Sequence, residues 1–242
     1  MTVDDIRVSK GTSNGNAARS TRQSRHRFAA LALLIALGLV WILASGEEKK
    51  MAERTFHADR IAYFESAGWR AYYDRNWLRV LGLMVQLNRE QFGMSWPNAI
   101  LASLDVVRAS LAFAPVDNDI PAATAHLAYY YAKARCAAGI AADAEKLAAL
   151  EIDYWVVHRR LANERKAAPD HTGDLTPMVD ALSSLHEALF AVPPDVARRS
   201  AVMRAAAAAR VDRITGGYSD DVEADWRQIE VELRQAYQIL DE

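Results

Sequence analysis

An unbroken run of 18 residues without a charge or a proline, FAALALLIALGLVWILAS at residues 28–45, constrains this chain more than any other feature. At about 1.5 Å per residue, a helix over this run would span roughly 27 Å, close to the hydrocarbon thickness of a bilayer. A helix that is apolar on every face belongs in a membrane or in the middle of a large core. Charged residues cluster on both sides of the run, and a buried helix would not need them. We therefore expect a single transmembrane helix over residues 28–45.

A cleaved signal peptide is the alternative interpretation of this run. Ala44, Ser45 and Gly46 would serve as a cleavage site of small residues, and basic residues precede the run. However, the apolar part of a signal peptide usually has about 7–15 residues, which is shorter than the run here. The length favours a permanent anchor, and secretion after cleavage near Gly46 remains the alternative.

Basic residues around the run predict its orientation. Four arginines fall within residues 19–27, whereas Lys49, Lys50 and Arg54 are the basic residues that follow the run most closely. Because the more basic flank usually stays in the cytoplasm, we expect the N-terminus inside and the C-terminal domain outside. The frequent use of alanine, and of arginine over lysine, is typical of GC-rich bacterial genomes. The expected location is therefore the bacterial cytoplasmic membrane, with the C-terminal domain in the periplasm.

Charge is distributed unevenly between the two sides of the run. Residues 1–27 carry a net charge of +4 and residues 46–242 a net charge of −6. The stretch SKGTSNGNAAR within the first segment has little to bury, so residues 1–27 are expected to form a disordered, basic, cytoplasmic tail. A basic tail joined to a mildly acidic body is not typical of a nucleic-acid-binding domain, so we expect no nucleic-acid partner.

Residues 46–242 are predicted to form one all-α globular domain. No segment shows the sustained alternation of apolar and polar residues that is typical of a strand. Proline, glycine and capping residues predict helix boundaries near residues 73–76, 95–97, 115–121, 139–142, 168–177, 193–195 and 216–221. The expected architecture is an irregular multi-helix bundle, in which the loop at 168–174 is the one candidate boundary between two cores.

A short helical array is the alternative architecture. The segment AGWRAYYDRNWLRVL at residues 67–81 resembles the helix–turn–helix unit of tetratricopeptide repeats, with an aromatic first helix. A second copy at a period of about 34 residues is not evident in the sequence. The resemblance implies a superhelical array of helix pairs as the alternative to a bundle.

The last predicted helix carries a regular apolar seam, in which the spacing alternates between four and three residues. The seam comprises Val222, Trp226, Ile229, Leu233, Ala236 and Leu240. It predicts either docking of this helix on the bundle or a homodimer through the last helix. Trp226 and Leu233, together with Trp69 and Tyr73 from the aromatic segment, are therefore candidates for an interaction surface.

Motifs for common chemistries are absent from the sequence. It contains no glycine-rich phosphate loop, no hydrolase nucleophile elbow, and no paired histidine or cysteine motif for a metal. Cys136 is the single cysteine, which excludes an intramolecular disulfide and a cysteine cluster. We therefore predict no cofactor, no metal site and no specific catalytic residue.

One polar cluster remains as a candidate site. His126, Tyr130 and Lys133 share one helix face, and Glu151 and His158 fall on the expected core face of the next helix. Because Glu151 and His158 are about 10 Å apart along the axis, each needs a partner from another helix, and the first three residues are the candidates. A buried network of this kind can bind a small ligand or take part in catalysis.

Two functions follow from these observations. By elimination, the chain is expected to be a membrane-anchored interaction or scaffold protein that holds a protein partner. The alternative is a helical-bundle enzyme or small-ligand-binding domain that uses the buried polar cluster. The first predicts an exposed apolar patch, and the second predicts that the cluster converges on a pocket.

Overall fold

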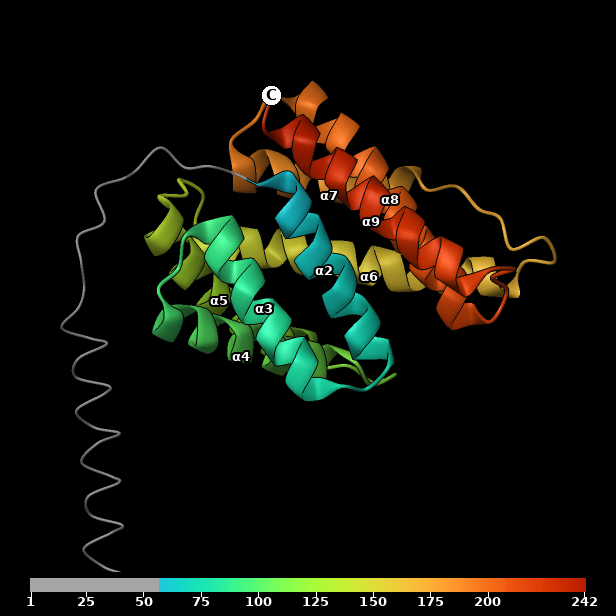
Figure 1. Cartoon of the computed structure of the whole chain (residues 1–242), viewed down its shortest axis with the longest axis horizontal. Helices are drawn as coiled ribbons and strands as arrows, with labels where there is room; N and C mark the ends of the chain where they lie inside the picture. The colour runs from blue at the N-terminus through green and yellow to red at the C-terminus, as the bar shows by residue number, and fades with distance from the viewer. Residues whose placement is uncertain (1–56) are drawn as a thin grey trace, which may run out of the picture. The chain divides into compact units, whose positions relative to one another are not determined.

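The computed structural model describes residues 57–242, which form eight α-helices and contain no strand (Figure 1). The all-α prediction is thereby confirmed for this part of the chain. The predicted tail at 1–27 and the predicted transmembrane helix at 28–45 lie outside the described residues. Among residues 57–242, no helix is both long enough and apolar enough to cross a bilayer.

Helix boundaries fall close to the proline, glycine and capping residues of the sequence. The helices are α2 (Ala58–Tyr73), α3 (Trp77–Phe92), α4 (Trp96–Phe113), α5 (Ile120–Ala138), α6 (Ala144–Ala167), α7 (Thr176–Phe190), α8 (Pro194–Gly216) and α9 (Val222–Leu240). The sequence allowed a break in the first long helical stretch near Gly68 or at residues 73–76, and the structure has it at residues 74–76.

Capping residues explain several of these helix ends. The side chains of Asn76, Asp119 and Asp221 each accept a hydrogen bond from the backbone N–H three residues later, so they cap α3, α5 and α9. Gly93 and Gly139 follow α3 and α5 in the left-handed conformation, with φ of 66° and 67°. Glycine adopts this conformation without a steric cost, and it ends the helix there.

The eight helices form a closed ring. Each helix packs against the next one along the chain, and α9 packs back against α2. In Figure 1, α3–α5 lie at the lower left and α7–α9 at the upper right, while α2 crosses in front and α6 behind. Thus α2 joins the two groups on one side through α3 and α9, and α6 joins them on the other through α5 and α7.

Closure of the ring distinguishes this arrangement from an open helical array. In an array of repeats, each unit contacts only its neighbours, so the first and last helices stay apart. Here buried side chains of α2, α8 and α9 form one apolar cluster, which includes Ile61, Trp226 and Leu233. The contact between α2 and α9 therefore favours the predicted irregular bundle.

The loop at residues 168–175 does not separate two cores. Tyr154 and Leu161 of α6 pack in one apolar cluster with Met178 and Leu182 of α7, which follows the loop. The described residues 57–242 accordingly belong to one compact unit.

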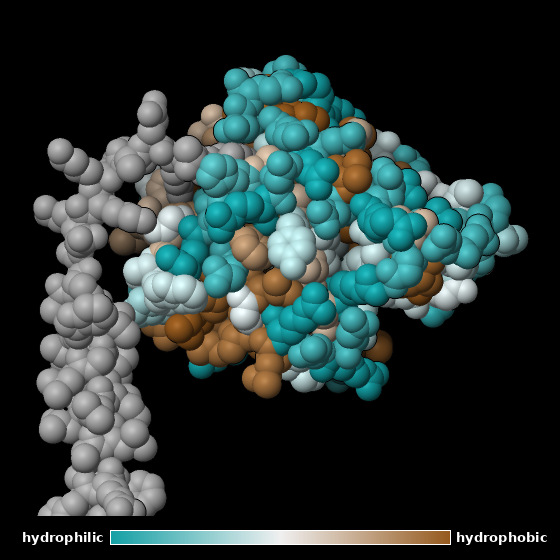
Figure 2. Space-filling view, viewed as in Figure 1, coloured by the Kyte–Doolittle hydropathy of each residue, from teal (hydrophilic) through white to brown (hydrophobic). Residues whose placement is uncertain are grey.

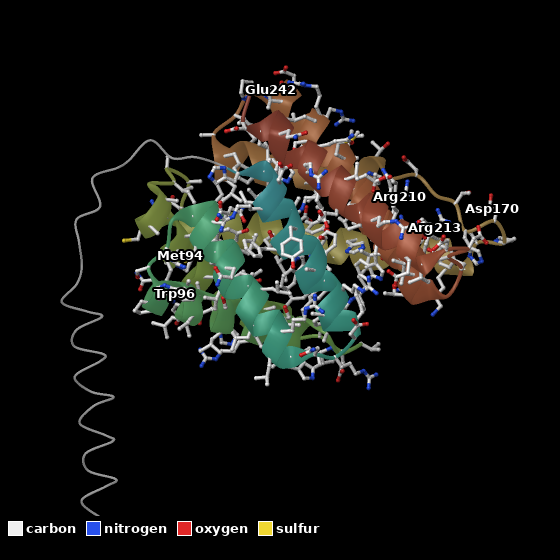
Figure 3. All side chains as sticks on the ribbon, in the orientation of Figure 1. Met94, Trp96, Asp170, Arg210, Arg213 and Glu242 are labelled. Atoms are coloured by element: carbon white, nitrogen blue, oxygen red, sulfur yellow. The ribbon has the colours of Figure 1, made fainter. Side chains whose placement is uncertain are left out.

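The seam of the last helix faces the interior of the ring. Trp226, Ile229 and Leu233 are buried against α2 and α8, whereas Val222 at the first turn is exposed. Ion pairs support the same contact, because Arg210 of α8 (Figure 3) pairs with Asp225 and Glu232 of α9. In the described residues, α9 therefore docks on the bundle through this seam.

Candidate functional site

A cavity of about 480 Å³ lies within the ring, and all eight described helices contribute to its wall. This volume falls in the range of about 300–1,000 Å³ that is usual for small-molecule pockets. Aromatic side chains form much of the wall. They are Phe64, Trp69, Tyr72, Tyr73, Phe92, Phe113, Tyr130, Tyr131, Tyr154, Trp155, Phe190 and Tyr237.

An ion pair between partly buried Arg204 and buried Glu65, together with the Tyr237 hydroxyl, joins three helices at the wall of the cavity. Arg204 of α8 donates from Nη1 and Nη2 to the two carboxylate oxygens of Glu65 on α2, at 2.9 and 2.5 Å. The hydroxyl of Tyr237 on α9 also donates to Glu65, at 2.6 Å. Burial alone would lower the pKa of Arg204, but the Glu65 carboxylate holds that pKa well above its usual value. Arg204 is therefore charged, and Glu65 occupies both of its terminal nitrogens.

A second carboxyl group, that of Glu151 on α6, is held by two neutral donors. Tyr131 Oη donates to Glu151 Oε2 at 2.9 Å, and Trp155 Nε1 donates to Oε1 at 2.7 Å. Burial raises the pKa of Glu151, while the charge of Arg204 and these two hydrogen bonds act in the opposite direction. Burial also raises the pKa of Tyr131 well above its usual value, so Tyr131 remains an O–H donor.

A third polar group lies where α6 meets α8. His158 Nε2 lies 3.0 Å from Asp212 Oδ1, and Arg165 pairs with the other carboxylate oxygen. The ring of His158 stacks on Tyr154 with 5.7 Å between centroids. Asp212 and Arg165 are both buried, so each satisfies the charge of the other.

Two further polar side chains at the cavity wall come from α3 and α7. Tyr130 donates to Asn88 at 3.2 Å, and Asn88 in turn donates to the Ser103 hydroxyl at 3.1 Å. His186 is buried, and its Nδ1 has no hydrogen-bond partner among the described residues. The ring of helices brings Asn88, His186 and the ion-paired residues of α8 around the same cavity.

The structure brings together three of the five residues in the predicted polar cluster. Tyr130, Glu151 and His158 all line the cavity. Lys133 does not, because its Nζ pairs with Asp105 of α4 at 2.6 Å. His126 is partly buried on α5 and is also not part of the cavity wall.

Partners for Glu151 and His158 do come from other helices, as expected, but they are not the residues nominated from the sequence. Glu151 is bound by Tyr131 rather than by Tyr130, the next residue along α5. His158 is bound by Asp212 of α8. Two neighbouring residues on a helix point their side chains about 100° apart. The periodicity of a short stretch does not distinguish which of the two faces the partner.

The four residues predicted for an interaction surface lie in different environments. Trp69 and Tyr73 line the cavity, and Tyr73 is also 44% exposed. Trp226 and Leu233 are buried between α9 and its neighbours. These four side chains therefore do not form one exposed patch.

The sequence patterns did not predict Glu65, Arg204 or Asp212 as site residues. Glu65 pairs with Arg204, and Asp212 pairs with Arg165. Their signal was a charged residue on a face that is otherwise apolar or alanine-rich. Glu65 shares its helix face with Ile61 and Ala62, which are fully buried. Arg204 interrupts an alanine-rich stretch of α8 whose residues Ala201, Ala205, Ala207 and Ala208 are buried.

Comparisons with known proteins do not assign this site. No family model matches the chain, and neither a curated protein nor a solved structure matches it. Within residues 57–242, no group of three or more histidine, cysteine or acidic side chains could hold a metal ion. The function must therefore be argued from the cavity itself.

Proposed function

We propose that this chain is a membrane-tethered domain that binds a small molecule in the central cavity. The observation that carries the proposal is a cavity of about 480 Å³ between the eight helices, lined by aromatic side chains and hydrogen-bonded charges. Small-molecule sites typically combine an apolar, aromatic wall with a few fixed polar groups.

The size of the cavity argues against a packing defect. Protein interiors are close-packed, and their voids are rarely much larger than one water molecule. A space of about 480 Å³ would instead hold on the order of ten or more waters. A space of this size between packed helices is large enough for a small molecule.

The polar groups of the wall support a preorganised site. Glu65 is fixed by Arg204 and Tyr237, Glu151 by Tyr131 and Trp155, so neither carboxylate needs to reorient to meet a ligand. Groups that are already ordered lose little conformational entropy on binding. The proposed tether is the apolar run at residues 28–45, which would hold the domain at the outer face of the bacterial cytoplasmic membrane.

Filling the cavity tests this proposal. A Cβ added at Gly68, which lines the cavity, would meet no atom within 4 Å, so Gly68→Phe directs a ring into the open space. Gly82 on α3 is the matched control, because its added Cβ also meets no atom, but it is exposed and lies outside the cavity wall. The full-length chain should co-purify with a small molecule that native mass spectrometry detects. Gly68→Phe should lose that molecule, and Gly82→Phe should keep it.

A different result would contradict the binding function. If Gly68→Phe retains the same bound mass at the same occupancy as Gly82→Phe, the molecule does not occupy the cavity. If wild-type protein carries no molecule and binds none of 3-phenylpropylamine, 3-phenylpropan-1-ol and 3-phenylpropionate, the cavity is not a ligand site.

A second candidate function, the anchored interaction domain, is favoured by one surface feature. The outer face of α4 carries Trp96, Ile100 and Leu111, which are 49%, 43% and 66% exposed and share one helical stripe. Figure 2 shows an apolar area over this part of the molecule, and Figure 3 shows Trp96 at the start of α4. A photo-crosslinking residue at position 100 in membranes should capture a single partner, whereas one at exposed Val202 on α8 should not. Equal labelling from both positions would exclude a specific surface on α4.

A further inference from the structure

Among the acidic side chains of the cavity wall, Glu151 differs in having no ion pair within residues 57–242. Glu65 pairs with Arg204, and Asp212 pairs with Arg165 and His158. Glu151 accepts hydrogen bonds only from the neutral groups of Tyr131 and Trp155. A carboxylate can accept about four hydrogen bonds, so Glu151 retains capacity for a further donor.

The surroundings of Glu151 are rich in aromatic rings. Tyr131 and Trp155 contact its carboxyl group directly, and Tyr130 packs edge-on against Tyr131 with 4.9 Å between ring centroids. Tyr154 lies on the same helix and lines the same cavity. The faces of such rings attract cations through their quadrupoles, and the attraction increases where water is excluded.

The cationic side chains of the wall are already engaged. Both terminal nitrogens of Arg204 bind Glu65. Arg159 donates to the backbone carbonyls of Phe113 and Pro115, at 2.7 and 3.0 Å, and lies 3.8 Å over the Phe113 ring. An anionic ligand would therefore meet few free donors and the three carboxyl groups of Glu65, Glu151 and Asp212, which disfavours its binding.

We propose that the cavity binds an organic cation, an amine or ammonium group on an apolar body, whose charge pairs with Glu151 among the aromatic rings. This inference rests on the binding function proposed above and names its ligand class. The apolar body lies against the aromatic wall, and the ammonium group pairs with the Glu151 carboxylate, which has no ion-pair partner within residues 57–242.

Binding of a cation should be coupled to the ionisation of the buried Glu151 carboxyl group. Burial raises its pKa in the free protein, Glu65 adds to the rise, and Arg204, Tyr131 and Trp155 oppose it. A bound cation stabilises the ionised carboxylate, so binding releases a proton from the fraction of Glu151 that is protonated. The affinity for a cation should consequently fall as the pH falls through the titration of Glu151.

Three probes of the same shape but different charge test the ligand class. They are 3-phenylpropylamine, 3-phenylpropan-1-ol and 3-phenylpropionate, titrated by calorimetry into the full-length chain held in lipid nanodiscs. The Gly68→Phe variant measures partition into the lipid and is subtracted. The amine should bind at least about tenfold more tightly than the alcohol, and the carboxylate should bind most weakly.

Glu151→Gln should remove the preference for the amine while the affinity for the alcohol stays within about twofold. Glu145→Gln is the matched control, since Glu145 is an exposed glutamate on the same helix. Its preference should equal that of wild type. In buffers of different ionisation enthalpy, amine binding by wild type should release protons, and alcohol binding should not.

Two outcomes would overturn the cation assignment. The alcohol or the carboxylate could bind as tightly as the amine, or Glu151→Gln could keep the full preference for the amine. In either case the cavity still binds a small molecule, so the proposed binding function stands and only the ligand class is wrong. If none of the three probes binds and no molecule co-purifies, both the cation assignment and the proposed binding function are wrong.

Discussion

His186 shows how one buried residue couples the fold to pH. Its imidazole lies at the cavity wall on α7 and is almost completely buried. Burial lowers its pKa from 6.5 to about 3, and the positive charge of Arg204 acts in the same direction. The unfolded chain therefore takes up a proton at this residue near pH 6.5, whereas the folded protein does so only near pH 3. Because the unfolded state binds more protons in this window, the free energy of unfolding falls as the pH falls.

We predict that His186→Gln reduces the acid sensitivity of the protein. Between pH 6.5 and pH 3, titration of His186 should lower the free energy of unfolding of the wild-type chain by on the order of a few kcal/mol. The free energy of unfolding of the variant should fall correspondingly less. Urea unfolding of both chains at a series of pH values measures the difference. Exposed His57 supplies the control, and His57→Gln should leave the pH dependence as in wild type. Parallel curves for wild type and His186→Gln would contradict the prediction.

At the scale of a helix, the end of α7 is strained. Ala191 ends this helix with φ of 54° and ψ of 38°, in the left-handed region. A residue with a Cβ pays a steric cost of about 1–2 kcal/mol there, and glycine does not. The sequence uses glycine at the corresponding ends of α3, α5 and α8. Ala191 is exposed, so no packing contact requires its methyl group.

We predict that Ala191→Gly stabilises the protein by about 0.5–1 kcal/mol, because relief of strain exceeds the added flexibility of the unfolded chain. The control is Ala132→Gly, at an exposed position within α5, which should destabilise by about 1 kcal/mol. Denaturant unfolding measures both. A loss of stability in Ala191→Gly similar to that in the control would show that the end of α7 carries no strain.

At the scale of the whole molecule, stability depends on closure of the ring. Glu65 on α2 binds Arg204 and Tyr237, which lie 139 and 172 residues later on α8 and α9. This buried pair links the first described helix to the last two. A buried ion pair is costly to break, because the partner that remains keeps its charge without compensation.

We predict that Glu65→Gln lowers the free energy of unfolding by about 3–5 kcal/mol, as Arg204 then loses its counter-ion. The exposed pair between Arg70 and Glu223 also joins α2 to α9, so Glu223→Gln is a matched control and should change stability little. Both variants are compared with wild type by urea unfolding. Equal effects in the two variants would mean that burial of the Glu65 pair does not hold the ring closed.

Local patterns predicted most of the helices and their ends. The prolines that open α4, α5 and α7 and the glycine that closes α5 act over a few residues, so the sequence alone reveals them. The candidate site was predicted in part, since Glu151 and His158 stand out as ionisable groups on a core face. Their partners were not predicted, because contacts between helices depend on the rotation and spacing of both.

By itself, the sequence determined that residues 57–242 fold mainly as helices, where most of those helices end, and that Glu151 and His158 lie on an inward face of α6. The tertiary structure alone decided that α9 returns to α2, that Glu65 pairs with Arg204, and that a cavity remains at the centre. The physical reason is the distance along the chain over which each interaction acts. Capping and periodicity act within a few residues of one helix, whereas closure of the ring and its buried pairs join residues more than a hundred positions apart.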